Sequence, residues 1–566
     1  MSKIIIYQVL PRLFGNKVDQ PVFNGDISQN GCGKMNDFTL AALKKIKSLG
    51  TTHIWYTGLL EHATQTDYSS FGIKRDHRAM VKGKAGSPYA IKDYYDIDPD
   101  LASTPQKRME EFDALIERTH RVGLKVIIDF VPNHVARQYG SDSKPEGVCD
   151  LGDTDNSLLS FSPQNNFYYI PGQKLCCRFN MTSTETQPYI ENPAKATGND
   201  CFCHTPGIND WYETVKLNYG VDYCGGSGKH FKPTPDTWQK MCDILLFWAA
   251  RGVDAFRCDM AEMVPVEFWD WAVKKVKTQY PDIKFIGEVY NPSLYRDYIF
   301  HGRFDYLYDK VGLYDTLRGV VRMEKGAHTI THCWQQTDDI KQHMLYFLEN
   351  HDEQRLASDF YAGEGKKGIP ALVVAAMMNT NPYMHYFGQE FGEPAMEREG
   401  FSGLDGRTTI FDYWRVKTVQ QWIGKGNYSS KNLSPESQRL YTCYKKIISA
   451  AVGHPDFASG LFYDLMYVNF NNPLFDPNRQ YAFARRSADG CSLIVCNFSN
   501  SPVEVEVNIP SHLFDFLEIA PRRYDAKELL SGKKTFVDFF PDRPAKVAIG
   551  EWSAAILQFK PERQQH

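Results

Sequence analysis

The chain lacks long apolar runs, which membrane proteins have, and it lacks an excess of positive charge, which nucleic-acid-binding proteins have. Its longest apolar runs, residues 244–250 and 371–378, fall far short of the roughly 20 residues that cross a bilayer. It has no excess of positive charge either, because the net charge is −4. We therefore expect neither a membrane span nor a nucleic-acid partner.

The first residues also lack the pattern of a secretion signal. They contain one lysine and a brief apolar stretch that Pro11 interrupts, whereas a signal peptide needs a longer apolar core and a small-residue cleavage site. We interpret residues 4–10 as a first strand. The expected location is the cytoplasm, unless a leader was removed.

Cysteine is present but does not form a recognisable metal-binding or disulfide pattern. Six of the 13 cysteines fall in one segment: Cys149, Cys176, Cys177, Cys201, Cys203 and Cys224. Disulfides, reduced thiols and a zinc site all remain open, and His204 beside Cys203 slightly favours zinc. Since the spacing fits no standard set of Cys-x-x-Cys pairs, we expect ordinary thiols.

What the chain does have is a repeated alternation of strand-like and helix-like segments over its first 450 residues. Expected strands are 4–10, 53–57, 125–130, 253–256, 284–286, 304–308, 344–348 and 383–386. Expected helices include 37–49, 104–122, 235–251, 265–280 and 434–451, the last with Ser434 as N-cap. Eight βα repeats predict a (β/α)8 barrel, in which parallel strands close on themselves.

Two segments depart from this repeat. Residues 136–229, after the third strand, are too long for a structureless loop and predict a small inserted domain. Residues 455–566 change to alternating apolar and polar positions between turns, which predicts a C-terminal antiparallel β-sandwich. The barrel itself is then formed by residues 1–135 and 230–454.

Four apolar runs in the barrel region end in acidic or basic residues, at 129–134, 252–259, 285–289 and 347–352. In a barrel of this kind the carboxyl ends of the strands meet on one face, where catalytic groups lie. Asp259, Glu288 and Asp352 are therefore expected in one pocket. Any one of them has a plain alternative as a helix cap, but their joint occurrence at strand ends favours a site.

Three carboxylates in a pocket suit the breakage of glycosidic bonds. Retention of configuration needs a nucleophile and a protonated acid about 5–5.5 Å apart. Arg257 lies two residues before Asp259 on the same strand, and we expect it to keep Asp259 ionised as the nucleophile. An apolar setting is expected to raise the pKa of Glu288 and suit it to the acid role. His134 and His351, as neutral imidazoles, would donate hydrogen bonds to a sugar.

The four segments resemble the four signature regions of the α-amylase family, glycoside hydrolase family thirteen. The resemblance extends over the whole chain, with barrel, insertion and C-terminal sandwich. It implies that Asp259 is the nucleophile, Glu288 the acid/base and Asp352 the transition-state stabiliser. It also implies that Arg257, His134 and His351 line the sugar subsite. Tyr89 resembles the family tyrosine that stacks under the same sugar.

Some positions depart from the family pattern. Ser87 stands where many members have a histidine, and Glu262-Met263 replace a lysine–histidine pair on the leaving-group side. Asn133 resembles a calcium ligand of the calcium-dependent members, and Asp150, Asp153 and Asp155 are candidate partners for it. The chemistry itself needs no cofactor, whereas a structural calcium ion stays an open expectation.

The predicted function is a retaining glycoside hydrolase that cleaves α-glucosidic bonds, with α-1,4 bonds favoured, in oligosaccharides derived from starch or glycogen. Interception of the same covalent intermediate by a sugar would instead make the protein a transglycosylase or a glucosyl- or maltosyltransferase. An inactive carbohydrate-binding or scaffold protein on the same fold is a third alternative. The sequence leaves linkage, chain length and oligomeric state open.

Overall fold

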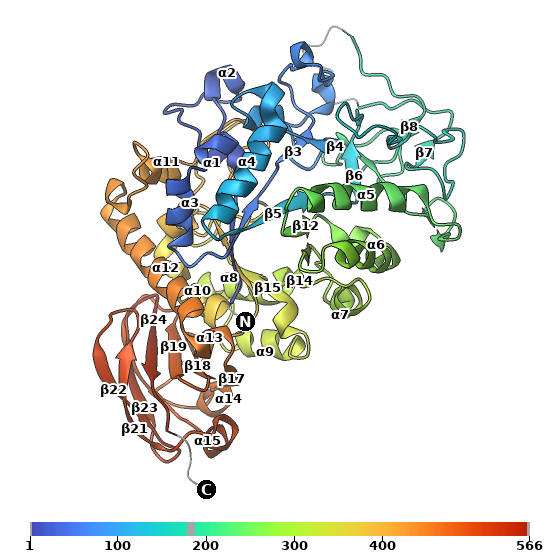
Figure 1. The fold of residues 1–566 in the computed structure, drawn as a ribbon. Coiled ribbons are helices and arrows are strands. Elements are labelled where there is room, and N and C mark those ends of the chain that lie inside the picture. Colours follow the sequence, from blue (N-terminus) through green and yellow to red (C-terminus); the bar gives the residue numbers. More distant parts are fainter. Residues whose placement is uncertain (1–2, 178–186, 563–566) are drawn as a thin grey trace.

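The computed structural model describes residues 3–177 and 187–562, and its centre is a closed barrel of parallel strands (Figure 1). Neighbours in the barrel follow chain order, and the last strand pairs with the first. The strands are β1 (Ile5–Val9), β2 (His53–Tyr56), β5 (Lys125–Phe130), β12 (Ala255–Cys258), β13 (Lys284–Gly287), β14 (Tyr306–Tyr308), β15 (Met344–Phe347) and β16 (Tyr383–Tyr386). The predicted (β/α)8 barrel is confirmed.

These strands form where short apolar runs alternate between two buried environments. Side chains that point inward, such as Trp55, Ile127, Ile286 and Met384, form one cluster inside the barrel. Side chains that point outward, such as Phe256, pack with the surrounding helices. Because both faces are buried, the strands are nearly continuously apolar, and a charged residue at a strand end stands out.

Helices cover the outside of the barrel, as the helical periodicity predicts. The main ones are α3 (Leu40–Lys47), α4 (Arg108–Arg121), α5 (Asp236–Ala250), α6 (Val266–Gln279), α7 (Tyr295–Phe300), α8 (Asp315–Val321), α9 (Thr329–Gln336), α10 (Ile369–Met377) and α12 (Pro435–Gly453). Ser434 caps α12 by accepting a hydrogen bond from the backbone N–H of Ser437. None of the helices in the described ranges is both long and apolar enough to span a bilayer.

The inserted segment after β5 is held together by short antiparallel pairs rather than by a sheet of its own. β6 (His134–Ala136) pairs with β9 (Thr214–Lys216), and two smaller pairs join β7 (Tyr169–Ile170) to β8 (Ala194–Lys195) and β10 (Val221–Asp222) to β11 (Gly228–Lys229). All thirteen cysteines are free thiols. No Cys/His cluster that could bind zinc occurs among the described residues.

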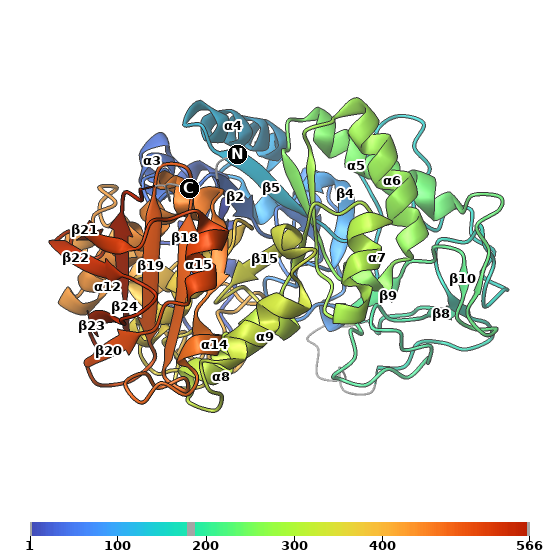
Figure 2. The ribbon, with the colours of Figure 1, turned by 90° about the horizontal axis from the view of Figure 1, so that it is seen from below.

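The C-terminal region is antiparallel, as predicted. Its larger sheet has the order β17-β18-β19-β24-β21-β22, and β20 pairs with β23. The strands are β17 (Leu461–Asp464), β18 (Gln480–Arg486), β19 (Cys491–Asn497), β20 (Val503–Val507), β21 (Arg522–Glu528), β22 (Lys534–Phe539), β23 (Ala545–Ile549) and β24 (Ser553–Phe559). The apolar helix α10 contacts β19 and β24. Figures 1 and 2 show this region and the insertion on opposite sides of the barrel.

Candidate active site

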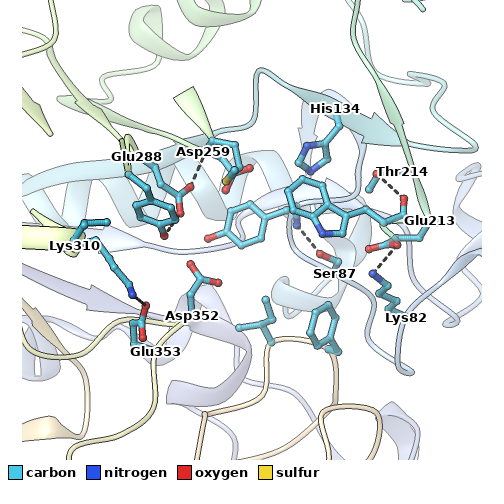
Figure 3. Close-up of a pocket in the computed structure, with 17 residues that line it drawn as sticks. Lys82, Ser87, His134, Glu213, Thr214, Asp259, Glu288, Lys310, Asp352 and Glu353 are labelled. Atoms are coloured by element: carbon cyan, nitrogen blue, oxygen red, sulfur yellow. Dashed lines mark hydrogen bonds and ion pairs between the residues drawn. The ribbon is translucent and has the colours of Figure 1, made fainter. Parts of the chain in front are cut away.

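The predicted carboxylates meet at the carboxyl ends of the barrel strands, around a cavity of about 470 Å³. Asp259 directly follows β12, Glu288 directly follows β13, and Asp352 follows β15 after a short turn. Figure 3 shows Asp259 and Glu288 on one wall, with Asp352 facing them across the cavity. The volume lies within the range of about 300–1,000 Å³ that is usual for small-molecule sites.

Arg257 links the carboxylates from below the cavity floor. Its Nη1 donates to Asp259 Oδ1 at 2.7 Å, and its Nη2 lies 2.7 Å from Glu288 Oε2. A third carboxylate, Asp129 on β5, is 3.6 Å from Nη1, because the strand register places Asp129 opposite Arg257. The guanidinium is fully buried, so each of these contacts acts in a medium of low polarity.

Aromatic rings surround the same guanidinium. It lies over Trp55, Tyr89 and Tyr308, with ring-centroid distances of 5.2, 5.4 and 5.5 Å. A planar cation enclosed by ring faces is attracted by each ring and cannot change direction easily. Arg257 is therefore fixed in position before any substrate arrives.

The clustered carboxylates take up a proton more readily than isolated ones. Burial raises the pKa of Asp259 well above its ordinary value, and Arg257 opposes this rise without cancelling it. Burial and the charge of Glu288 raise the pKa of Asp352 to about 7. Its side chain is 39% exposed toward the cavity, so solvent moderates that shift. The expectation that Arg257 alone keeps Asp259 ionised is therefore incomplete, since burial acts against the ionised form.

Glu288 is surrounded by hydrogen-bond donors, not by the apolar setting expected from the residues before it. Tyr290 donates its hydroxyl to Oε1 at 2.5 Å, and the backbone N–H of Met260 donates to Oε2 at 2.8 Å. Met260 has a left-handed backbone, with φ of 43°, in the turn directly after Asp259. Such a conformation is costly for a side chain like methionine, and it is found where geometry at a site requires it.

His351 connects Asp352 to Tyr89. Gln8 donates to its Nδ1 at 2.8 Å, so the ring proton belongs on Nε2. Nε2 lies 3.0 Å from Asp352 Oδ2 and 2.6 Å from the Tyr89 hydroxyl. Burial lowers the pKa of His351 well below its usual range, with Arg257 adding to the effect, so the ring is neutral as expected.

His134 lies on the insertion side of the cavity. It begins β6, and its ring lies 5.2 Å from that of Trp211. Burial, helped by Lys216 and Lys82, lowers the pKa of His134 to about 3. This imidazole is also neutral, as expected, and can exchange hydrogen bonds with sugar hydroxyls without bringing a charge.

The cavity contains residues that sequence reasoning did not single out. Trp211, Tyr290 and Phe411 add aromatic wall, and ion pairs join Lys82 to Glu213 at 3.0 Å and Lys310 to Glu353 at 3.4 Å. Asp129, which contacts Arg257 beneath the cavity, lies in the segment 129–134 that carries the family resemblance, and this was the available signal for it. The others come from loops whose approach to the site depends on the whole fold.

Of the departures from the family pattern, only one lies in the cavity wall. Within the described residues, that wall includes Ser87 but neither Glu262 nor Met263. Glu262 instead accepts the backbone N–H groups of Tyr290 and Asn291, both at 3.0 Å. It thus supports the loop that places Tyr290 against Glu288.

Asn133, the expected calcium ligand, contacts a lysine. Its Oδ1 accepts a hydrogen bond from Lys216 Nζ at 2.8 Å, and that ammonium also pairs with Asp200 at 2.6 Å. The candidate partner Asp155 is occupied by N–H donors of Asn166 and Phe167. An ammonium beside the amide oxygen repels a divalent cation, so these residues do not fit a calcium ion.

The comparisons with known proteins agree with this geometry. The model of the alpha amylase catalytic domain matches residues 8–421. Alpha-amylase 3 of Dictyoglomus thermophilum is 24% identical over 64% of this chain and 66% of its own length. An alpha-1,4-glucan:maltose-1-phosphate maltosyltransferase of Picrophilus torridus is 24% identical over 50% of this chain and 32% of its own length.

The chain thus spans from about a third to about two-thirds of the length of these curated relatives. Among solved structures, the maltogenic alpha-amylase AmyB from Thermotoga neapolitana aligns with a TM-score of 0.62 over 98% of both chains, at 19% identity. At that identity the likeness shows the fold alone. With the catalytic-domain model matching most of its length, this chain belongs to the alpha-amylase family.

Proposed function

We propose that the protein is a retaining glycoside hydrolase that cleaves α-glucosidic bonds, preferably α-1,4, in maltooligosaccharides derived from starch or glycogen. The observation that supports it most is the arrangement around Arg257. One buried guanidinium contacts both Asp259 and Glu288 at 2.7 Å, and Asp352 faces them across an open cavity. Double displacement requires a nucleophile and an acid that flank the bond to be cleaved, and Arg257 holds both carboxyl groups at this cavity.

In the first step, Asp259 Oδ attacks the anomeric carbon of the bound sugar. The bond to the leaving oxygen breaks, and Glu288 supplies the proton that this oxygen needs. In the second step, water attacks the same carbon while Glu288 takes up the water proton. The bond to Asp259 breaks, both carboxyl groups return to their starting states, and the configuration is retained.

The remaining residues of the cavity bind the sugar and stabilise the positive charge that develops on its ring. Asp352 and the ring of Tyr89 face the positive charge that develops on the sugar ring, and the charge on Asp352 stabilises it. The neutral rings of His134 and His351 bind hydroxyl groups without competing with that charge. Arg257 partly neutralises the negative charge of the carboxylate cluster.

The test is a product profile of the wild-type chain and of Asp259→Asn against maltotriose, starch, pullulan, sucrose and trehalose. We expect maltotriose and starch to be shortened by the wild type. The variant should lose at least about 10⁴-fold in turnover, since removal of the nucleophile of a covalent mechanism has effects of that order. Asp113→Asn, at an exposed ion pair with Arg251, is the matched control. Near-normal turnover by Asp259→Asn would refute the assignment.

Transfer to a second sugar is the alternative that the cavity also favours. Trp211, Tyr290 and Phe411 line its wall, and aromatic faces bind sugar rings while excluding water. A bound sugar hydroxyl would then intercept the covalent intermediate in place of water. Maltotriose distinguishes the two functions, because transfer gives products longer than the substrate and hydrolysis gives only shorter ones.

A further inference from the structure

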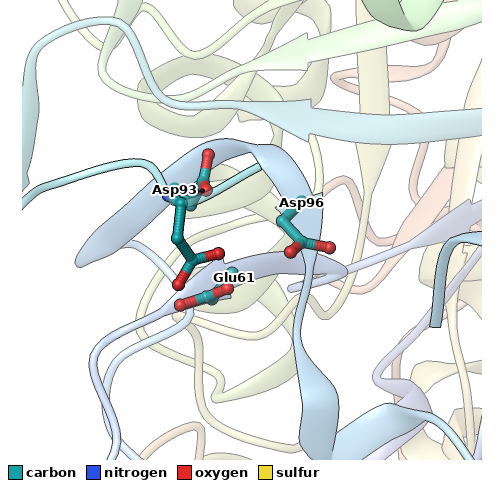
Figure 4. Close-up of side chains that lie close together, drawn as sticks. Glu61, Asp93 and Asp96 are labelled. Carbon is teal, nitrogen blue, oxygen red and sulfur yellow. Dashed lines mark hydrogen bonds between the residues drawn. The ribbon is translucent and has the colours of Figure 1, made fainter. Parts of the chain in front are cut away.

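A second acidic cluster lies outside the cavity, in the hairpin that follows β2. Glu61 is on β3 (Leu60–His62), Asp93 and Asp96 are on β4 (Ile91–Ile97), and Asp142 is in the inserted segment. One carboxylate oxygen from each lies within 4.8 Å of the others. Figure 4 shows the carboxylates of Glu61, Asp93 and Asp96 directed at a common space.

The hairpin is bulged in a way that brings these side chains together. Glu61 pairs directly with Asp93, and the register shifts on both sides of Glu61. In a regular strand Asp93 and Asp96 would point to opposite faces, and like charges opposite each other destabilise a sheet. The bulge instead places four acids around one point, and bulges of this kind redirect side chains at functional positions.

Glu61 is the side chain whose environment is incomplete. It is 1% exposed, and neither of its carboxylate oxygens accepts a hydrogen bond from any residue that the structure describes. Lys92 approaches Oε1 only to 3.7 Å, because its ammonium is directed at Asp76 at 3.2 Å. A buried carboxylate without a hydrogen bond is costly, and a cation in the common space would compensate it.

Hydrogen bonds hold two of the other three acids, Asp93 and Asp96, in position. Asp93 accepts the backbone N–H groups of Asp142 and Ser143 at 3.0 and 3.1 Å. Asp96 accepts from Arg108 Nε at 2.8 Å and from the Ser143 hydroxyl at 2.6 Å. Counting Asp76, the described residues place five carboxyl groups beside two cationic side chains, Lys92 and Arg108.

We propose that Glu61, Asp93, Asp96 and Asp142 bind one calcium ion, which joins the β3–β4 hairpin to the start of the inserted segment. Four carboxylates within 4.8 Å of one another suit calcium, which takes about six to eight oxygen ligands in flexible geometry. Magnesium demands a regular octahedron, keeps several of its waters and is usually held by only one or two carboxylates, so calcium is preferred. The site is separate from Asn133, where Lys216 already supplies a positive charge.

The ion would also stabilise part of the cavity wall. Ser87 and Tyr89 immediately precede β4, and Tyr89 contacts His351 at 2.6 Å. A tie between β4 and the inserted segment therefore restrains the residues that receive the sugar. This effect on activity is secondary, and calcium binding by these acids does not depend on the proposed reaction.

Calorimetric titration of the chelator-treated full chain with CaCl2, and then with MgCl2, tests the site. We expect one calcium ion per chain, magnesium binding at least about 10-fold weaker, and a Tm rise of about 2 °C at a 100-fold excess over Kd. Absence of calcium binding, or equal affinity for magnesium, would overturn the proposal.

Variants assign the binding to these residues. Glu61→Gln keeps the size of the side chain and should abolish calcium binding. Glu399→Gln is the matched control, since Glu399 is also buried with an unpaired carboxylate oxygen but belongs to no such cluster. Asp142→Asn, at an exposed position that tolerates change, should weaken binding at least about 10-fold. Unchanged binding in both cluster variants would refute the site.

Discussion

The protein contains two groups of buried carboxylates that differ in what lies between them. Around Asp259, Glu288 and Asp352, one arginine contacts two of the acids, and an open cavity separates these from the third. Around Glu61, the acids converge to within 4.8 Å, and Glu61 accepts no hydrogen bond within the described part of the chain. The first arrangement leaves room for a sugar and a proton, whereas the second leaves room for an ion.

The difference teaches that acidity alone does not identify a catalytic site. Both groups contain acids with raised pKa values, to about 7 at Asp352 and to about 6 at Asp93, in each case mainly because of burial. Only the barrel group adds neutral histidines, a tyrosine and a cavity to its acids. The same chemical change made in each group should therefore have opposite consequences.

The largest contrast is expected between Glu288→Gln and Glu61→Gln. Glu288→Gln cannot protonate the leaving oxygen, so turnover of maltotriose should fall at least about 10⁴-fold. A maltosyl fluoride, whose leaving group needs no proton, should lose much less. Glu61→Gln should retain turnover of both substrates. Steady-state kinetics with the two substrates decide this, and equal losses on both by Glu288→Gln would contradict its role as acid.

A second contrast compares the two arginines. Arg257→Lys keeps the charge but cannot reach Asp259 and Glu288 together, so kcat should fall about 10²-fold or more. Arg108→Lys, beside Asp96, makes the same change in the other group and should leave kcat within about twofold while altering calcium affinity. If Arg257→Lys kept nearly full kcat, the guanidinium of Arg257 would not be needed to position Asp259 and Glu288.

The pH dependence should follow the barrel group alone. Asp352 must be ionised to stabilise developing positive charge, and its raised pKa means that it takes up a proton as the pH falls through about 7. The value of kcat/KM should therefore decline below about pH 7, by up to about tenfold per pH unit. His134, with a pKa of about 3, is neutral over this pH range, so His134→Gln should lower kcat/KM without moving the pH at which the decline begins. A decline that begins only near pH 4 would contradict the raised pKa of Asp352.

The smallest effect is expected from removal of one hydroxyl. Tyr89→Phe loses the contact with His351 but keeps the ring, so kcat/KM should fall about tenfold, the equivalent of one hydrogen bond. Tyr95→Phe, on strand β4 of the acidic hairpin, is the control and should behave as wild type. Equal behaviour of the two variants would remove Tyr89 from the sugar subsite.

The barrel strands could be predicted from the sequence to within one or two residues at most ends, because each is an apolar run bounded by turns. Asp259, Glu288 and Asp352 followed from their position at strand ends. Tyr290 and the partners of Glu288 could not, because they depend on how separate loops meet above the barrel. Lys216 beside Asn133 is a pairing across two strands of the insertion, and no local pattern predicts it.

The Glu61 group illustrates the same limit. Glu61, Asp93 and Asp96 lie in ordinary polar positions of the sequence, and regular strands would separate them. Their convergence depends on the register shift in β3 and β4 and on the return of the chain at Asp142. Sequence reasoning identifies acids at strand ends but not acids that a bulge brings together.

The central claim is that Asp259 forms a covalent bond to the sugar. A maltosyl fluoride with a second fluorine on the reacting ring slows both steps and lets the intermediate accumulate. After digestion, mass spectrometry should find one added fluoromaltosyl group on the peptide that contains Asp259, and none in Asp259→Asn. A label on the peptide that contains Asp352 or Glu288, or equal labelling of Asp259→Asn, would contradict the account.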